Sequence, residues 1–165
     1  MKLYEQGLEK HPLKTVVLSN LAMIIWIALG TLSCWFLYPL AAWIYLALAL
    51  IMVGFVLRKI VCTNCYYYGK WCSTGWGKLS ALLFKEGEME KFSKSIGVRI
   101  APLVYGLMSL VPAILLIVSL VREFTVPKII ILACLLLITV YSAFISRRKG
   151  CANCKMKLVC PGSVS

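Results

Sequence analysis

Long apolar segments alternate with short polar segments along the chain. The apolar segments cover about residues 16–38, 40–57, 100–121 and 129–145. A helix needs roughly 20 apolar residues to cross the hydrocarbon core of a bilayer, and these segments approach or exceed that length. Within each pair, only a few residues separate one segment from the next. The pattern therefore predicts an all-α membrane protein whose four transmembrane helices form two helical hairpins.

The segment between the hairpins has a different pattern. From residue 76 to 96, apolar residues such as Trp76, Leu83 and Phe92 recur near helical spacing with lysines between them. This amphipathic spacing is typical of a helix that lies along the membrane surface. We expect an interfacial helix in the central loop, with a break at Gly87.

Composition supports the membrane class. Hydrophobic residues make up 61% of the 165 residues, charged residues only 15%, and the mean hydropathy is +0.88. A water-soluble domain does not have this balance. The composition therefore excludes an ordinary soluble enzyme or binding domain.

The positive charges are distributed unevenly between the two sides of the predicted bundle. Of the 18 lysines and arginines, only Arg122 and Lys128 lie in the short loops within the hairpins. Positive residues concentrate on the cytoplasmic side of membrane proteins. We therefore expect a protein integral to the cytoplasmic membrane, with both termini and the central loop in the cytoplasm.

The net charge of +12 indicates an anionic partner. The cations flank apolar segments and form no groove-reading helix, so lipid head groups are expected rather than nucleic acid. The residues assigned to this lipid interface are Arg58, Lys59, Arg147, Arg148 and Lys149.

Landmarks recur along the chain at a spacing of 88 to 90 residues. Gly7 and Gly97 each precede a Pro-Leu pair by five residues, and Pro39 and Pro127 each stand at a hairpin turn. The landmarks predict an internal duplication with parallel repeats related by an axis along the membrane normal. The predicted units are a first hairpin repeat at residues 1–75, an interfacial linker at 76–96 and a second hairpin repeat at 97–165.

Each half ends in a cysteine-rich segment. The first reads RKIVCTNCYYYGKWC from residue 58, and the second reads RRKGCANCKMKLVC from residue 147. We call residues 62–72 the first box and residues 151–160 the second box. Their six cysteines are Cys62, Cys65, Cys72, Cys151, Cys154 and Cys160.

The C-x-N-C turn at the start of each box is suited to metal binding. Two thiolates at this spacing can reach one ion at roughly 2.3 Å, and two such turns supply four ligands. The paired turns resemble the knuckles of zinc ribbons and rubredoxins, which implies zinc. A third cysteine in each box exceeds the needs of a single tetrahedral ion, so an iron–sulfur cluster is the alternative.

Other residues receive weaker assignments. Cys34 and Cys134 lie inside predicted spans, where a cysteine usually packs as a small hydrophobe, and they are secondary candidates for relaying a soft metal. The residues YYYGKW, from position 66, are expected to form an aromatic belt at the membrane interface. His11, the single histidine, is expected to be solvated.

The remaining motifs limit the function. The chain has no nucleotide-binding loop, zinc-protease motif or serine elbow, and no catalytic acid or base is predicted. A metal-binding or electron-relay protein, with a redox or membrane-complex partner, is the first hypothesis. A membrane thiol–disulfide oxidoreductase is the second, because helix number and C-x-x-C usage resemble the quinone-linked disulfide-generating family. A soft-metal transporter, resembling bacterial mercury-uptake proteins, is the third.

Overall fold

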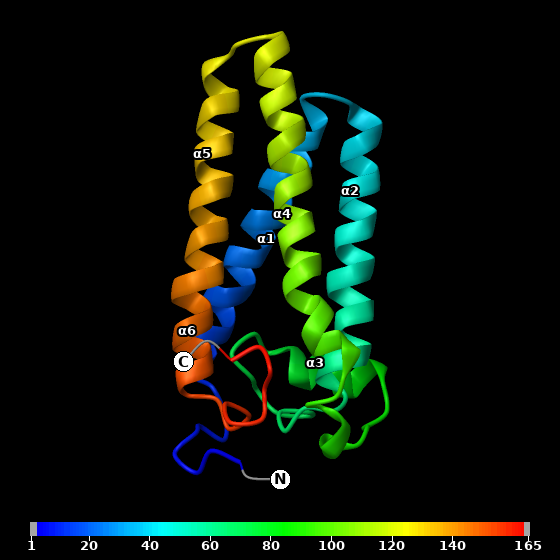
Figure 1. Ribbon diagram of the computed structural model, residues 1–165, viewed down its shortest axis with the longest axis vertical. Helices are drawn as coiled ribbons and strands as arrows, with labels where there is room; N and C mark the ends of the chain where they lie inside the picture. Colours follow the sequence, from blue (N-terminus) through cyan, green and yellow to red (C-terminus); the bar gives the residue numbers. More distant parts are fainter. Residues whose placement is uncertain (1–2, 164–165) are drawn as a thin grey trace.

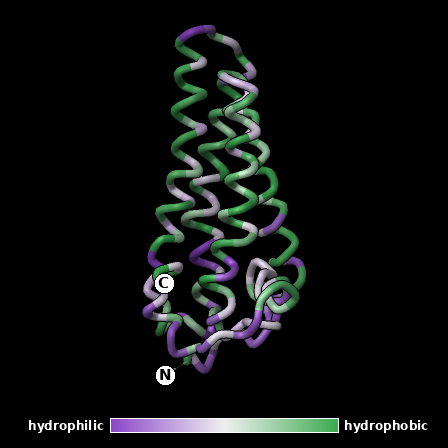
Figure 2. The backbone as a smooth tube through the Cα atoms, turned by 90° about the vertical axis from the view of Figure 1, so that its right-hand side faces the viewer, coloured by the Kyte–Doolittle hydropathy of each residue, from purple (hydrophilic) through white to green (hydrophobic). Residues whose placement is uncertain are grey.

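Four long helices run side by side through most of the computed structural model, which describes residues 3–163 (Figure 1). Their bounds are Leu13–Trp35, Pro39–Cys62, Ile96–Arg122 and Val126–Ala152. Each is long and apolar enough to cross a membrane. Hydrophobic residues follow the shafts of the bundle, whereas hydrophilic residues gather at the end that carries both termini (Figure 2). The prediction of an all-α protein with four candidate transmembrane helices is confirmed.

The second helix of each hairpin extends farther than the hydrophobic pattern predicted. α2 (Pro39–Ile51) continues through the π-helical segments η1 (Met52–Val56) and η2 (Arg58–Cys62). α5 (Val126–Val140) continues through the π-helical η4 (Tyr141–Ser146) into α6 (Arg147–Ala152). Lysine and arginine interact favourably with a helix C-terminus, so the polar ends can remain helical. Each long helix thereby reaches the first half of its cysteine box.

Proline begins the second helix of each hairpin. Pro39 is the first residue of α2, and Pro127 is the second residue of α5. A proline is tolerated at these positions because the first turn of a helix has no internal partner for its N–H groups. The chain therefore reverses within a few residues after α1 (Leu13–Trp35) and after α4 (Ile96–Arg122).

The core of the bundle forms where α1 packs against α2, α4 and α5. The Trp26 indole N–H donates to the Ser109 hydroxyl at 3.1 Å, and the Tyr45 hydroxyl donates to the Met108 carbonyl at 3.0 Å. Gly30 permits the Tyr45 ring to approach α1, because a Cβ at that position would overlap the ring. Buried polar side chains therefore link the two hairpins to each other.

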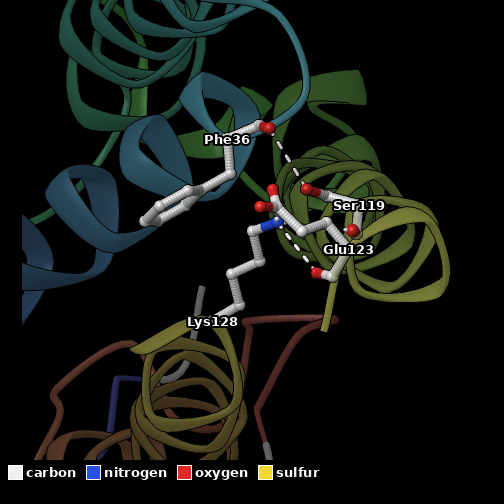
Figure 3. Close-up of polar contacts among 4 residues, drawn as sticks. All are labelled: Phe36, Ser119, Glu123 and Lys128. Carbon is white, nitrogen blue, oxygen red and sulfur yellow. Dashed lines mark hydrogen bonds and ion pairs between the residues drawn. The ribbon is translucent and has the colours of Figure 1, made fainter. Parts of the chain in front are cut away.

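A buried lysine lies where the two hairpins meet, at the end opposite the termini (Figure 1 and Figure 3). The Lys128 ammonium, on α5, donates to the backbone carbonyls of Glu123 at 3.0 Å and Ser119 at 3.4 Å, and pairs with the Glu123 carboxylate at 3.4 Å. The Ser119 hydroxyl donates to the Phe36 carbonyl at 3.1 Å and so links the two hairpins. The lysine therefore caps the C-terminus of α4, where the Ser119 carbonyl also accepts from the Glu123 N–H.

The central connection is only partly helical. α3 spans Trp76–Leu83, residues 85–88 have no regular structure, and a short 3₁₀ turn, η3, spans Met89–Lys91. The helix thus ends before the position predicted for its break. After α3 the chain contacts the first box instead of continuing as a helix. The Tyr68 hydroxyl donates to the Phe84 carbonyl, and the Gly87 N–H donates to the Thr63 carbonyl.

Candidate functional site

Both cysteine boxes lie at the end of the bundle that carries the two termini (Figure 1). A cluster formed by Phe92, Val98 and Met156 packs against Cys65 of the first box and Cys154 of the second. The fold therefore brings the two boxes, separated by almost 90 residues in sequence, into one packed region.

The two boxes share the same local backbone geometry. In each C-x-N-C turn the N–H of the second cysteine donates to the carbonyl of the first, at 3.3 Å in the first box and 3.1 Å in the second. The side-chain amides of Asn64 and Asn153 each donate to the carbonyl four residues earlier, at 3.4 Å. Asparagine is suited to such local hydrogen bonds. A π-helical segment precedes both turns, a feature that is frequent at functional sites.

Backbone N–H groups are directed at the second sulfur of each turn. Burial raises the pKa of both thiols, and the backbone N–H groups of Tyr67 near Cys65 and of Met156 near Cys154 partly offset that rise. Tyr67 and Met156 occupy matching positions and are only 2% and 1% exposed. Hydrogen bonds of this kind stabilise a thiolate more than a thiol. The repeated arrangement therefore suits sulfur that carries negative charge.

Tyr67 connects the two boxes. Its hydroxyl donates to the Leu8 carbonyl at 2.6 Å, accepts from the Lys155 N–H at 3.1 Å and lies beside the Cys154 sulfur. For this residue the predicted aromatic belt is wrong, because Tyr67 is buried inside the protein. The sequence held one signal of this burial. Tyr67 stands two residues after Cys65, and the matching position after Cys154 is the apolar Met156.

Burial favours the neutral form of three thiols outside the helical spans, Cys65, Cys154 and Cys160. Burial raises the pKa of Cys65, and the neighbouring thiols Cys62, Cys154 and Cys72 raise it further. Burial also raises the pKa of Cys154 and of Cys160. All eight cysteines carry free thiols. A bound cation would be required to offset the cost of several buried thiolates.

The third cysteine of each box lies near its own C-x-N-C turn. The Cys72 sulfur is 3.3 Å from the Thr74 hydroxyl. Cys160 lies near Cys151, and the Gly162 N–H lies near its thiol. Each half therefore gathers its three sulfurs in one neighbourhood.

The segment before α1 packs against the second box, and the first turn of α4 packs against the helix end that leads into the first box. Leu8 forms an isolated parallel β-bridge with Cys154, and a Cβ on Gly7 would stand 2.7 Å from the Lys155 nitrogen. Gly97 lies against the side chain of Ile60, just before the first box. The glycines are therefore needed for close approach. We call this reciprocal arrangement the crossed contact.

His11 is buried, so the prediction that it is solvated is wrong. It is 6% exposed, its ring lies 5.5 Å from the Tyr67 ring, and its backbone N–H donates to the Trp71 carbonyl at 2.9 Å. Burial lowers the pKa of its imidazole. The packing of residues 3–12 against the boxes excludes water from this side chain.

The cations assigned to the lipid interface differ in their surroundings. The Arg58 guanidinium stacks on Trp76, with 4.0 Å between its central carbon and the ring centroid, and Arg147 donates to the Gly162 carbonyl at 2.7 Å. Lys59, Arg148 and Lys149 are exposed. In the described part of the box region, Lys59, Arg148 and Lys149 are the assigned cations without a stacking or hydrogen-bond contact of this kind.

The secondary cysteine candidates lie apart from the boxes. Cys34 is 1% exposed and packs with Ala42, Tyr45 and Ala49 between α1 and α2. Cys134 is exposed on α5. The structure does not bring these two residues into contact with the boxes.

The donor chemistry of the box region suits a metal, although its present geometry is not that of a metal site. Across residues 3–163 no three histidine, cysteine, aspartate or glutamate side chains stand in a ready-made metal-binding geometry. The chemistry of the donors nevertheless fits a metal–thiolate group. Backbone N–H groups are directed at the sulfurs, and two buried donors beside the first box, Arg58 Nε and Ser80 Oγ, have no acceptor.

Comparison with protein-family models, with curated proteins and with solved structures finds no match to this chain. Its function is therefore argued from its own residues.

Proposed function

We propose that this protein binds a soft metal through its two cysteine boxes and acts as a metal-binding or electron-relay protein of the membrane. The observation that carries the proposal is the pairing of Cys65 and Cys154. A backbone N–H two residues on lies near each sulfur, and Tyr67 lies near both sulfurs. Polar N–H groups directed at sulfur favour thiolates, and thiolates are the protein ligands preferred by zinc and iron–sulfur clusters.

The proposed ligands are Cys62, Cys65, Cys151 and Cys154, with Cys72 and Cys160 available as additional ligands. Bound zinc would stabilise the packed boxes, whereas an iron–sulfur cluster would also accept and donate single electrons. The chain itself contributes hydrogen bonds to sulfur and apolar packing from Phe92, Val98 and Met156 that limits the access of water. Both properties tune a metal site.

The proposal includes the duplication and the orientation. The matching turns, the preceding π-helical segments and the crossed contact support two parallel repeats about an axis along the bundle. The distribution of positive charge supports placing the boxes and both termini in the cytoplasm. Exposed Lys59, Arg148 and Lys149 are then available to anionic lipid head groups.

Elemental analysis of the full chain, purified in detergent without oxygen, tests the metal proposal. We expect zinc or iron in at least equimolar amount, with visible absorption only if iron–sulfur is present. Cys65→Ser and Cys154→Ser should each lower the metal content by more than about half, because each removes a thiolate ligand. Cys134→Ser is the matched control and should retain the metal.

A folded, metal-free protein that also fails to take up added zinc or iron would overturn the proposal. Equal metal content in the wild type and both ligand variants would overturn the assignment of the ligands. Circular dichroism should accompany each measurement, so that loss of metal is not confused with loss of the fold.

A further inference from the structure

Two helical segments meet in register beside the first box. Arg58 and Cys62 lie four residues apart on η2, and Trp76 and Ser80 lie four residues apart on α3. Residues at this spacing share one face of a helix. Since Arg58 stacks on Trp76, the next turn places Cys62 beside Ser80.

This contact contains hydrogen-bond donors without acceptors. Among the described residues, Arg58 Nε and Ser80 Oγ are the buried side-chain nitrogen and oxygen atoms that lack a partner, and Ser80 is 0% exposed. Buried polar groups are nearly always paired, so each exception requires an explanation. The sulfurs of Cys62 and Cys72 lie near Arg58, and a thiol is only a weak acceptor. A thiolate would supply the strong acceptor that is missing.

The second box differs at the matching position. Arg147 corresponds to Arg58 in the repeat, but its guanidinium already donates to the Gly162 carbonyl. It therefore has a neutral backbone acceptor, whereas Arg58 has none at Nε. The two boxes are similar in backbone but unequal in the donors that surround their sulfurs.

We propose that Arg58 and Ser80 are positioning residues that donate hydrogen bonds to metal-bound thiolates of Cys62 and Cys72, so that the first box carries most of the negative charge of the centre. This inference rests on the proposed function and assigns unequal roles to the two halves. The stacked Trp76 ring fixes the guanidinium, and α3 excludes water from the hydroxyl. Hydrogen bonds to sulfur and nearby positive charge are known determinants of the electronic properties of such centres.

Cobalt(II) is the probe, because cobalt bound to thiolates has a sulfur-to-metal charge-transfer band. Removing a donor from a sulfur raises the energy of its lone pairs, so Ser80→Ala and Arg58→Gln should shift this band to longer wavelength at unchanged cobalt stoichiometry. Ser95→Ala is a matched control because its hydroxyl donates to the Ile60 carbonyl rather than to sulfur. Lys78→Gln removes an exposed cation from α3. Neither control should move the band.

An unchanged band in Ser80→Ala and Arg58→Gln, with cobalt bound, would overturn the inference. Should Arg58→Gln fail to fold, Ser80→Ala decides alone, because it removes one buried atom. An unshifted band in cobalt-bound Ser80→Ala would then overturn the inference.

The cobalt content separates this inference from the proposed function. A wild-type protein that binds no cobalt would reject the proposed function and the inference with it. Cobalt bound at equal stoichiometry, with the same band in the wild type and in both variants, would reject the inference alone.

Discussion

Single buried polar residues hold the two ends of this bundle. At one end, Tyr67 bonds to both the N-terminal segment and the second box. At the other end, Lys128 places its ammonium against the C-terminus of α4 (Figure 3). Neither side chain is replaceable by an apolar one of the same shape without leaving backbone groups unpaired. These residues are therefore the points at which small substitutions have large effects.

Lys128→Met tests the lysine contact. The substitution keeps the length of the side chain but leaves the Glu123 carbonyl without its donor and removes one of the two donors to the Ser119 carbonyl, so we expect a loss of about 1 to 3 kcal/mol in unfolding free energy. Arg122→Met, at an exposed cation of the same loop, should change stability by less than about 0.5 kcal/mol. Denaturation in mixed micelles measures both. Equal losses of unfolding free energy in Lys128→Met and Arg122→Met would show that Lys128 contributes only its charge and not its hydrogen bonds.

His11 should make stability depend on pH. Burial lowers its pKa in the folded protein below the usual 6.5, so below that pH the unfolded chain binds more protons than the folded chain. Stability is therefore fully present above pH 6.5 and falls as the pH decreases below it. Unfolding of the wild type and of His11→Phe is compared from pH 8 to 5. The variant should have the flatter profile, and identical slopes would contradict a buried neutral imidazole.

At the scale of elements, the helices end where tertiary contacts replace the helical pattern. The apolar segments predicted all four spans, because the requirement for burial in lipid acts on local composition. The extensions to Cys62 and Ala152 and the early end of α3 were not predicted. They depend on contacts with distant residues, such as the bond from Gly87 to Thr63, which no local pattern reveals. The box cysteines were identified from spacing, but the buried role of Tyr67 required the fold.

The crossed contact can be tested with glycine substitutions. In Gly7→Ala the new methyl group would meet the backbone of Lys155, which cannot move aside, so we expect a loss of about 1 to 3 kcal/mol. Gly97→Ala would meet Cγ2 and Cβ of Ile60, a β-branched side chain that is stiff at χ1, and should also be destabilising. Gly106→Ala is the control, because no atom lies within 4 Å and alanine favours the helix by about 0.5 to 1 kcal/mol. Thermal unfolding ranks the stabilities of the three variants. A Gly7→Ala variant as stable as the wild type would contradict the close approach of residue 7 to the Lys155 backbone.

At the scale of the whole molecule, hydrophilic residues gather at the end of the bundle that carries both termini (Figure 2). That asymmetry makes the orientation testable. A variant lacking Cys34 and Cys134 is treated with chelator and a membrane-impermeant maleimide in sealed vesicles. We expect the box cysteines to react in inside-out vesicles and to be protected in right-side-out vesicles, because positive charge favours the cytoplasmic side. The reverse result would favour the thiol–disulfide oxidoreductase, whose family works on the oxidising side.

The bridge between Leu8 and Cys154 also has a consequence for biosynthesis. Residues near position 8 leave the ribosome long before residue 154 has been translated. Contacts between such distant parts of a chain form late, because closing the loop has an entropic cost. Insertion of the last helix must therefore precede maturation of the second box. A chain that stops before residue 154 lacks this bridge, so its leading segment has no box to pack against.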